Sequence, residues 1–356
     1  MLNCGAKVRL IFGISTIFAQ KISKKNSMKR ILGIGNALID ALVKVENEQI
    51  LSELELPKGS MQLIDRNRYF SIRERFVSLH PKHTTGGSAC NTIHAIAMMG
   101  GQTALIGRVG NDDLSTVFAD ACREHDICAH LISDPQLPTG VASTIITPDG
   151  QRTFGTYLGA ASELTADDLQ PEWFAGYDYF YIEGYLVQNH DLIRRAVRMA
   201  HEAGLKVCLD LASYNIVEAD REFFAELLGN TDIVFANELE ARAFTLCDDP
   251  QRNVETLSRL CGIAVVKVGK QGVLVRRGEE QVECPARDVP HVVDTTAAGD
   301  YFSAGFLYAL ASGENLMRCA QLGSLLAGHI IEVVGTALPQ ATWQRIISEW
   351  NGADGQ

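Results

Sequence analysis

In the C-terminal half of the chain, hydrophobic and polar positions form two kinds of segment that alternate. Short apolar runs, typical of buried strands, are separated by longer stretches in which apolar positions recur at helical spacing. Repeated alternation of strand and helix predicts a mostly parallel sheet covered by helices on both faces, which is a doubly wound α/β fold. The expected strands are residues 179–182, 206–210, 232–235 and 264–268.

The N-terminal part opens with another apolar strand, from residue 30, that leads into a polar turn. Asn36 and Asp40 follow this strand, a position that suits ligand binding but also suits ordinary turn chemistry. Gly33 and Gly35 begin a Gly-x-Gly pattern, but no third glycine follows. The dinucleotide fingerprint therefore fails, which argues against an oxidoreductase with a nicotinamide cofactor.

A hairpin is predicted between residues 138 and 157. Two alternating runs rich in β-branched residues flank a Pro148-Asp149-Gly150 turn, which is a strong turn signal. The pattern alone leaves open whether this hairpin joins the main sheet or a separate one.

Composition narrows the function classes. The chain has 356 residues, of which 46% are hydrophobic, enough for one large core in one large domain or two smaller ones. Its formal net charge of -11 argues against a nucleic-acid partner, because an acidic surface repels phosphate backbones. Any phosphate site must therefore be built locally from backbone amides and a few cations.

The nine cysteines are scattered and include no Cys-x-x-Cys pair. Such a set is typical of reduced thiols in a cytoplasmic protein, and it argues against a disulfide framework or a zinc site.

The first residues superficially resemble a short signal peptide, because Lys7 and Arg9 precede an apolar run over 10–19. The fold signals begin only at Arg30, so we expect residues 1–27 to be a non-native or disordered extension and the native chain to open at Met28. No other segment approaches the roughly 20 apolar residues of a membrane span.

The stretch with the clearest chemistry lies near the C-terminus. Small residues at 296–299 separate an apolar run ending at Val293 from a helical pattern that begins near Asp300. Backbone N–H groups can crowd at such a helix start, where an anion binds. Asp300 is placed to take a proton from a hydroxyl group that attacks a phosphoryl group, although an Asp there can also be a simple helix cap.

The longer string resolves this alternative. Asp294-Thr-Thr-Ala-Ala-Gly-Asp300 and its continuation to Leu307 resemble the C-terminal signature of the ribokinase-like (PfkB-type) sugar and nucleoside kinases. The resemblance implies that Asp300 is the general base and that Ala297, Ala298 and Gly299 form the anion hole. Many members of the family have Gly at the position of Ala297, while ribokinase itself has Ala.

A second motif supports the resemblance, because Gly86-Gly-Ser-x-x-Asn91 is similar to the family's N-terminal signature. Paired glycines allow close backbone approach to a ligand, and the amides of a helix start can bond a hydroxyl group. The resemblance extends from Arg30 to about Leu338. The acceptor-binding residues that it implies are Asn36, Asp40, Gln62, Gly86, Gly87, Ser88, Asn91 and Tyr157.

Two further segments are implicated in phosphate binding. Asn237 and Glu240 lie on one face of a helix start, where the Glu can organise a hydrated Mg²⁺ or simply be solvated. In the family the matching Asn-x-x-Glu orders magnesium and phosphate. Lys267, Gly269 and Gly272 resemble the family's nucleotide loop, which is not a P-loop.

The resemblance also implies an adenine contact and an additional cation. Gly335 matches a turn that abuts the adenine, and Asp294 and Thr296 match residues that bind a monovalent cation. The implied cofactors are ATP, Mg²⁺ and K⁺.

The resemblance further implies a small inserted β-sheet lid, formed by residues 41–65 and 138–162. The α/β kinase core then comprises 28–40, 66–137 and 163–345. A lid sheet with exposed edges could pair with another copy of the chain, giving a homodimer.

Within the family, several segments look most similar to adenosine kinase and its bacterial relatives. The expected reaction is ATP-dependent phosphoryl transfer to a primary hydroxyl group of an adenosine-like nucleoside or of a sugar, with Asp300 as the base. A ribokinase- or fructokinase-like sugar kinase is the alternative. A non-catalytic binding protein would lose Asp300 or the anion hole, and both are present.

Overall fold

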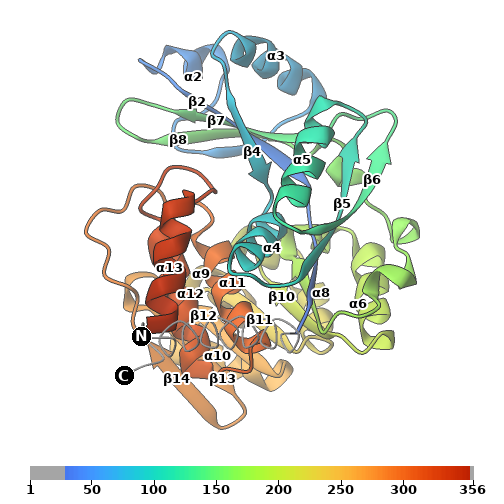
Figure 1. Ribbon diagram of the computed structural model, residues 1–356, viewed down its shortest axis with the longest axis vertical. Helices are drawn as coiled ribbons and strands as arrows, with labels where there is room; N and C mark the ends of the chain where they lie inside the picture. The colour runs from blue at the N-terminus through green and yellow to red at the C-terminus, as the bar shows by residue number, and fades with distance from the viewer. Residues whose placement is uncertain (1–28, 353–356) are drawn as a thin grey trace, which may run out of the picture.

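The computed structural model describes residues 29–352 and divides into two unequal parts (Figure 1). A large body of strands and helices carries a smaller sheet on one side, with α2 and α3 at the top of the view. The expected extension over 1–27 lies outside the described residues. Among the described residues, no helix is long and apolar enough to cross a membrane, and the cysteines are free.

The large sheet has nine strands in the order β14-β13-β12-β11-β10-β9-β1-β5-β6. All neighbours are parallel except for the pairs that involve β13, which are antiparallel. The mostly parallel sheet expected from the sequence is thus confirmed. Its strands are β1 (Ile31–Ile34), β5 (Thr103–Gly110), β6 (Cys128–Asp134), β9 (Tyr179–Glu183), β10 (Lys206–Asp210), β11 (Ile233–Asn237), β12 (Ile263–Lys267), β13 (Val273–Arg277) and β14 (Glu280–Cys284).

Alternate residues of each central strand enter two separate cores, because successive side chains of a strand point to opposite faces. Phe235 of β11 packs in one core and its neighbour Val234 in the other. The first core lies under α4 (Ser88–Met98), α5 (Asp113–Glu124), α11 (Ala298–Ala311), α12 (Leu316–Ile330) and α13 (Gln340–Gly352). The second lies under α6 (His190–Glu202), α7 (Tyr214–Ala219), α8 (Arg221–Leu228), α9 (Glu238–Thr245) and α10 (Pro250–Leu260).

Short 3₁₀ segments connect some of these elements. They are η1 (Gly159–Glu163), η2 (Ala166–Asp168), η3 (Pro171–Phe174), η4 (Gly184–Gln188) and η5 (Gly269–Gln271).

The smaller sheet has five strands in the order β3-β8-β7-β2-β4. Its strands are β2 (Leu38–Lys44), β3 (Met61–Leu63), β4 (Lys82–Gly86), β7 (Gly140–Ile146) and β8 (Arg152–Tyr157). The predicted hairpin is the antiparallel pair β7–β8, and it belongs to this sheet and not to the main one. On the outer face, α2 (Gln49–Glu53) and α3 (Arg66–Val77) bury a third core that includes Tyr69, Ile72 and Phe76.

The smaller sheet takes more of the chain than the sequence suggested. Both α3 and β4 belong to it, although residues 66–137 were expected in the kinase core. The strand β4, Lys-His-Thr-Thr-Gly, has no apolar alternation, and the apolar residues of α3 form only a weakly amphipathic pattern. Nothing in their local pattern therefore indicates which sheet they join, and their pairing with distant segments decides it.

The parallel strands bring polar residues to one edge of the main sheet. β9 ends at Glu183, β10 at Asp210, β11 at Asn237 and β12 at Lys267, and Asn36 follows β1. Ligands of open α/β sheets bind at the carboxyl ends of the strands. The smaller sheet covers this edge.

Candidate active site

A cavity of about 450 Å³ lies between the carboxyl edge of the main sheet and the smaller sheet. We call its core-side residues the floor and the cleft-facing residues of the smaller sheet the roof. The floor comprises the lining residues Asn36, Ser88, Asn91, Glu183, Tyr185 and Leu186. We include Asp300 in it, which is not itself a lining residue but is hydrogen-bonded to Ser88 and Asn91. The roof comprises Asp40, Leu42, Met61, Leu63, Arg152, Phe154 and Thr156.

Asp300 is held in one orientation by side chains from the start of α4. Ser88 Oγ donates to Asp300 Oδ1 at 2.7 Å, and Asn91 Nδ2 donates to Oδ2 at 2.8 Å. Burial raises the pKa of Asp300 to about 6, although these two hydrogen bonds oppose the rise. A carboxylate that is fixed, desolvated and ionised at neutral pH is suited to accept a proton.

The predicted anion hole is the first turn of α11. Ala297, the N-cap, has a left-handed backbone with φ of +61°, a conformation that costs a non-glycine residue about 1–2 kcal/mol. Ala298 N already donates to Thr295 O at 3.2 Å, whereas the next amides of the first turn have no acceptor within the helix. The helix dipole favours negative charge beside them. Strain of this kind tends to occur at functional sites, because the surrounding structure has to hold it in place.

Lys267 supplies a cation at this turn. A Cβ atom built on Gly299 would lie 3.1 Å from Lys267 Nζ, so the ammonium group packs directly against the backbone of the turn. Burial alone would lower the pKa of Lys267, but the nearby carboxylates of Asp210, Glu240 and Asp300 raise it above its usual value. The side chain therefore stays charged beside the anion hole.

Glu240 and Asn237 form a reciprocal capping box at the start of α9. Asn237 N donates to Glu240 Oε2 at 2.8 Å, and Glu240 N donates back to Asn237 Oδ1 at 2.9 Å. Asn237 Nδ2 also donates to Glu240 Oε1 at 2.6 Å. The Glu is 4% exposed, so it is not the solvated residue that a bare helix start would show. Burial and the nearby Asp210 raise its pKa to about 7, while the positive charge of Lys267 opposes the rise.

Asp40 lies where the smaller sheet meets the core. Thr336 Oγ1 donates to Asp40 Oδ2 at 3.0 Å, and burial raises the pKa of Asp40 to about 7. The paired glycines leave room for it, since a Cβ on Gly86 would come within 2.3 Å of Asp40 Oδ1. Gly87, with φ of +99°, packs so that a Cβ would lie 2.0 Å from Asn36 O.

Asn36 is bound to an acidic residue that we did not single out as a site residue. Asn36 Nδ2 donates to Glu183 Oε1 at 2.7 Å, and Ala89 N donates to Oε2 at 2.9 Å. Burial raises the pKa of Glu183 to about 7. The sequence signal for Glu183 was an acidic residue at the end of an apolar strand. In the structure, the Glu183 side chain connects β9 to the start of α4 through its hydrogen bond with Ala89 N.

Arg152 is the second residue that sequence reasoning missed. Its Nη1 lies 2.6 Å from Asp294 Oδ2 and donates to Thr296 Oγ1 at 3.3 Å. The other terminal nitrogen, Nη2, is buried without a hydrogen-bond partner, and Arg152 lines the cavity. An Arg after a Pro-Asp-Gly turn carries no local signal for this role, which depends on the smaller sheet lying over the core.

The same Arg152 contact gives Asp294 partners on several sides. The Asp294 carboxylate accepts hydrogen bonds from Thr296 N at 3.1 Å and Gly335 N at 3.0 Å, in addition to its ion pair. The expected monovalent-cation site at Asp294 and Thr296 stays a prediction. Gly335 lies at Asp294 and lines the cavity.

Two predicted acceptor-binding residues face away from the cavity. Met61 and Leu63 line it, whereas Gln62 between them does not and donates instead to Ser60 Oγ at 3.4 Å. Tyr157 stacks on Tyr69 in the outer core of the smaller sheet, with ring centroids 4.7 Å apart. The structure does not bring these two side chains to the cavity, because neighbouring residues of a strand point to opposite faces.

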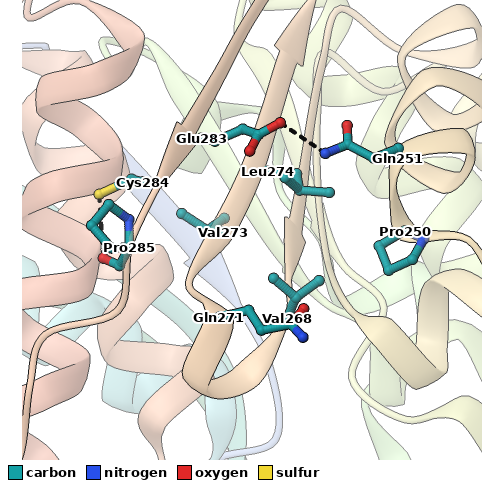
Figure 2. A pocket seen from close by; sticks show the side chains of 9 residues that line it. All are labelled: Pro250, Gln251, Val268, Gln271, Val273, Leu274, Glu283, Cys284 and Pro285. Atoms are coloured by element: carbon teal, nitrogen blue, oxygen red, sulfur yellow. Dashed lines mark hydrogen bonds between the residues drawn. The ribbon is translucent and has the colours of Figure 1, made fainter.

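The expected nucleotide loop is a glycine turn after β12. Gly269 and Gly272 have φ of +56° and +106°, and a Cβ on Gly272 would lie 2.0 Å from Cys284 O. Figure 2 shows a second cavity, of about 460 Å³, that adjoins this loop at Val268 and Gln271.

That second cavity lacks the chemistry of the first. Its one charged lining residue, Glu283, accepts a hydrogen bond from Gln251 Nε2 at 2.8 Å (Figure 2). The other lining residues are apolar or uncharged. We therefore place the reaction in the cavity between floor and roof.

A helix start that binds anions, a carboxylate fixed beside it and a covering sheet define an enzyme of phosphoryl transfer on an α/β scaffold. Comparison with known proteins identifies the family. Residues 65–343 match the pfkB family carbohydrate kinase model, and the chain belongs to this family.

Three relatives show how far the similarity extends. Adenosine kinase 1 of Arabidopsis thaliana is 25% identical over 332 residues, which cover 87% of this chain and 96% of the relative. The structure of adenosine kinase from Sinorhizobium meliloti matches with 35% identity and a TM-score of 0.78, covering 89% of this chain and 99% of that one. A probable sugar kinase from Rhizobium etli CFN 42 matches with 31% identity and a TM-score of 0.81, covering 92% and 99%.

The family match confirms the resemblance that the two signature motifs indicated. The similarity to the two solved structures confirms the expected ribokinase-like fold. The chain is a phosphotransferase with an alcohol group as acceptor, for which ATP is the phosphoryl donor and Mg²⁺ the usual companion ion.

Proposed function

We propose that this kinase phosphorylates a primary hydroxyl group of a nucleoside, with Asp300 as the general base. The observation that carries the proposal is the division of the cavity between floor and roof. Carboxylates and amides gather at the floor, whereas Leu42, Met61, Leu63 and Phe154 present an apolar roof. A nucleoside has a polar sugar and a flat, largely apolar base, so it matches both surfaces.

The catalytic step follows from the residues around Asp300. The acceptor oxygen attacks the γ-phosphorus of ATP and gives its proton to the Asp300 carboxylate. The bond between the γ-phosphorus and the β,γ-bridging oxygen breaks, so that the products are a phosphate ester and ADP. Ser88 and Asn91, which bond the Asp300 carboxylate, orient the base for this proton transfer.

Three groups converge on the place where negative charge develops. They are the amides of the α11 start and the Lys267 ammonium, which lie side by side in the core, and the Nη2 of the roof residue Arg152, which has no hydrogen-bond partner. Donors preorganised around a transferring group stabilise the transition state more than the ground state. Asp40 and Asn36 are then left to bind the sugar hydroxyl groups.

The acidic residues at the strand ends fit a hydrated Mg²⁺. Glu240 and Asp210 are both buried, and the charge of Asp210 contributes to the raised pKa of Glu240. Mg²⁺ keeps several waters and binds through few carboxylates, and when bound it neutralises charge on the phosphates. We propose Glu240 as the residue that orders it through water. We also propose Asp294 and Thr296 as the site of a monovalent cation, and no step of the reaction depends on it.

A homodimer through the smaller sheet stays a prediction. The outer face of that sheet is covered by α2 and α3, so a second copy would have to dock on an edge strand, β3 or β4. Sedimentation of the wild-type protein over a range of concentrations tests this.

The deciding experiment measures ATP consumption with Mg²⁺ across a panel of acceptors: adenosine, other nucleosides, ribose, fructose and phosphorylated sugars. We expect turnover to be selective for a nucleoside. Selectivity for a free sugar would refute the nucleoside assignment and favour the sugar-kinase alternative, which the similarity to a probable sugar kinase keeps in view. The Asp300→Asn variant serves as the control for contaminating kinases.

A further inference from the structure

The end of β10 carries a buried carboxylate that the proposed mechanism does not use as base or acceptor ligand. Asp210 is 5% exposed, and its two oxygens have separate partners. Ala212 N donates to Oδ1 at 2.8 Å, while Lys267 Nζ and Ser303 Oγ each lie 3.4 Å from Oδ2. One oxygen is therefore anchored to the backbone, and the other is directed at the ammonium group.

The turn after β10 anchors the carboxylate. Ala212 N donates to the Asp210 oxygen two positions earlier, which restricts the orientation of the Asp210 side chain. Ala212 itself has a positive φ of +62°, which is costly for a residue with a side chain. Strain of this kind persists where the surrounding structure holds it in place.

The Lys267 ammonium group lies between the Asp210 carboxylate and the backbone of Gly299. Its distance of 3.4 Å from Asp210 Oδ2 is long for a charge-assisted hydrogen bond, which is usually about 2.7–2.9 Å. On its other side the ammonium packs against the Gly299 backbone at the anion-binding turn. Lys267 is thus restrained by Asp210 without being fully engaged by it, and it can turn toward a phosphoryl group at the helix start.

We propose that Asp210 is a positioning residue, which holds the Lys267 ammonium at the start of α11 and lets it move onto the transferring phosphoryl group. The proposal rests on the proposed phosphoryl-transfer site and adds a residue to it. Asp210 acts through Lys267 and does not itself touch the substrate.

The test is a double-mutant cycle with Asp210→Asn and Lys267→Met, measured with Mg²⁺ and the acceptor that the panel selects. The amide of Asp210→Asn can still accept the Ala212 hydrogen bond, so the change removes mainly the charge. We expect Lys267→Met to lower kcat by about 10²-fold or more, as for loss of a donor at a developing charge. Asp210→Asn should lower kcat by about tenfold and leave the acceptor KM within about twofold, because it misplaces one such donor.

The signature of positioning is non-additivity. In the Lys267→Met background, Asp210→Asn should change kcat by less than about twofold, because the group that it positions is gone. If Asp210→Asn lowers kcat by about the same factor in the wild-type and Lys267→Met backgrounds, Asp210 is merely structural and the proposal is overturned. Thermal melting of each variant shows whether it is folded.

The chain offers a closely matched control. Asp134 also ends a strand, accepts a hydrogen bond from the amide two residues later, Gln136 N at 2.8 Å, and pairs with a cation, Arg108, at 2.8 Å. It does not line the cavity. Asp134→Asn removes an equivalent charge outside the cavity. We expect it to leave kcat within about twofold, because substitutions at sites that share no partners have independent effects.

ATP affinity separates failure of this proposal from failure of the proposed function. If no acceptor in the panel is turned over, the proposed function fails, and the same cycle is then measured by calorimetric binding of Mg·ATP. We expect Lys267→Met to weaken ATP binding by about tenfold and Asp210→Asn to add no further loss in that background. Equal losses in both backgrounds would again overturn the positioning role.

Discussion

The floor and the roof of the cavity are built on opposite principles. The floor side chains are already bonded to one another: Ser88 and Asn91 hold Asp300, and Glu183 holds Asn36. The roof exposes apolar surface, with Met61 53% and Leu63 62% exposed. Its charged residues, Asp40 and Arg152, are paired with core residues and not with one another.

This contrast assigns different tasks to the two regions. The floor side chains are already oriented, so no free energy is lost in reorienting them when charge develops in the transition state. These residues should therefore control kcat. An exposed apolar roof gains free energy when a ligand covers it, so its residues should control the acceptor KM. Arg152 is the roof residue that should behave like a floor residue, because it reaches the anion-binding loop.

The largest expected effect comes from removing the base at the floor. Asp300→Asn should lower kcat by about 10²–10⁴-fold while ATP binding is kept, because the amide cannot take the proton. Asp40→Asn, by contrast, should act mainly on the acceptor KM. Steady-state kinetics of both variants check this, and retained turnover in Asp300→Asn would remove Asp300 from the role of base.

Substitution of Arg152 should have the next largest effect on kcat. This roof residue belongs to the smaller sheet but contacts Asp294 in the core. Arg152→Met should lower kcat by about 10²-fold, the scale for loss of one preorganised donor. Arg152→Lys keeps a charge but loses the forked geometry that meets Asp294 and Thr296, so we expect it to recover only part of the rate. An unchanged kcat with a raised acceptor KM in both variants would make Arg152 an ordinary roof residue.

The pH profile tests the floor without mutation. Because Asp300 must be ionised to accept a proton and its raised pKa is about 6, kcat should fall as the pH drops below this value. The loss should approach about tenfold per pH unit below the pKa, and the rate should level off above it. Rates measured from pH 5 to 8 at saturating ATP and acceptor check this, and a flat acid limb would contradict the assignment.

The smallest expected effect is confined to the roof. Phe154→Ser should raise the acceptor KM by about tenfold, the equivalent of about 1.4 kcal/mol of lost apolar contact, with little change in kcat. Tyr157→Phe is the matched control on the same strand, because its ring packs against Tyr69 on the outer face. It should leave both constants unchanged, and a raised KM there would restore Tyr157 to the acceptor site.

Much of this enzyme could be predicted from local sequence patterns. The strands that became β9 to β12, the helix α11 and the β7–β8 hairpin each follow from periodicity or turn residues within the segment itself. Asp300 and the turn before it could be found in the same way, because an anion-binding helix start is a local structure made by consecutive residues.

The contacts between segments that are distant in sequence were decided only by the tertiary structure. Ser88 meets Asp300 across 212 positions and Asn36 meets Glu183 across 147, and Arg152 reaches Asp294 only because the smaller sheet lies over the core. The face on which Gln62 and Tyr157 lie depends on strand register, where a shift of one residue exchanges inside for outside. Periodicity determines which elements form, but pairing and register determine which side chains meet.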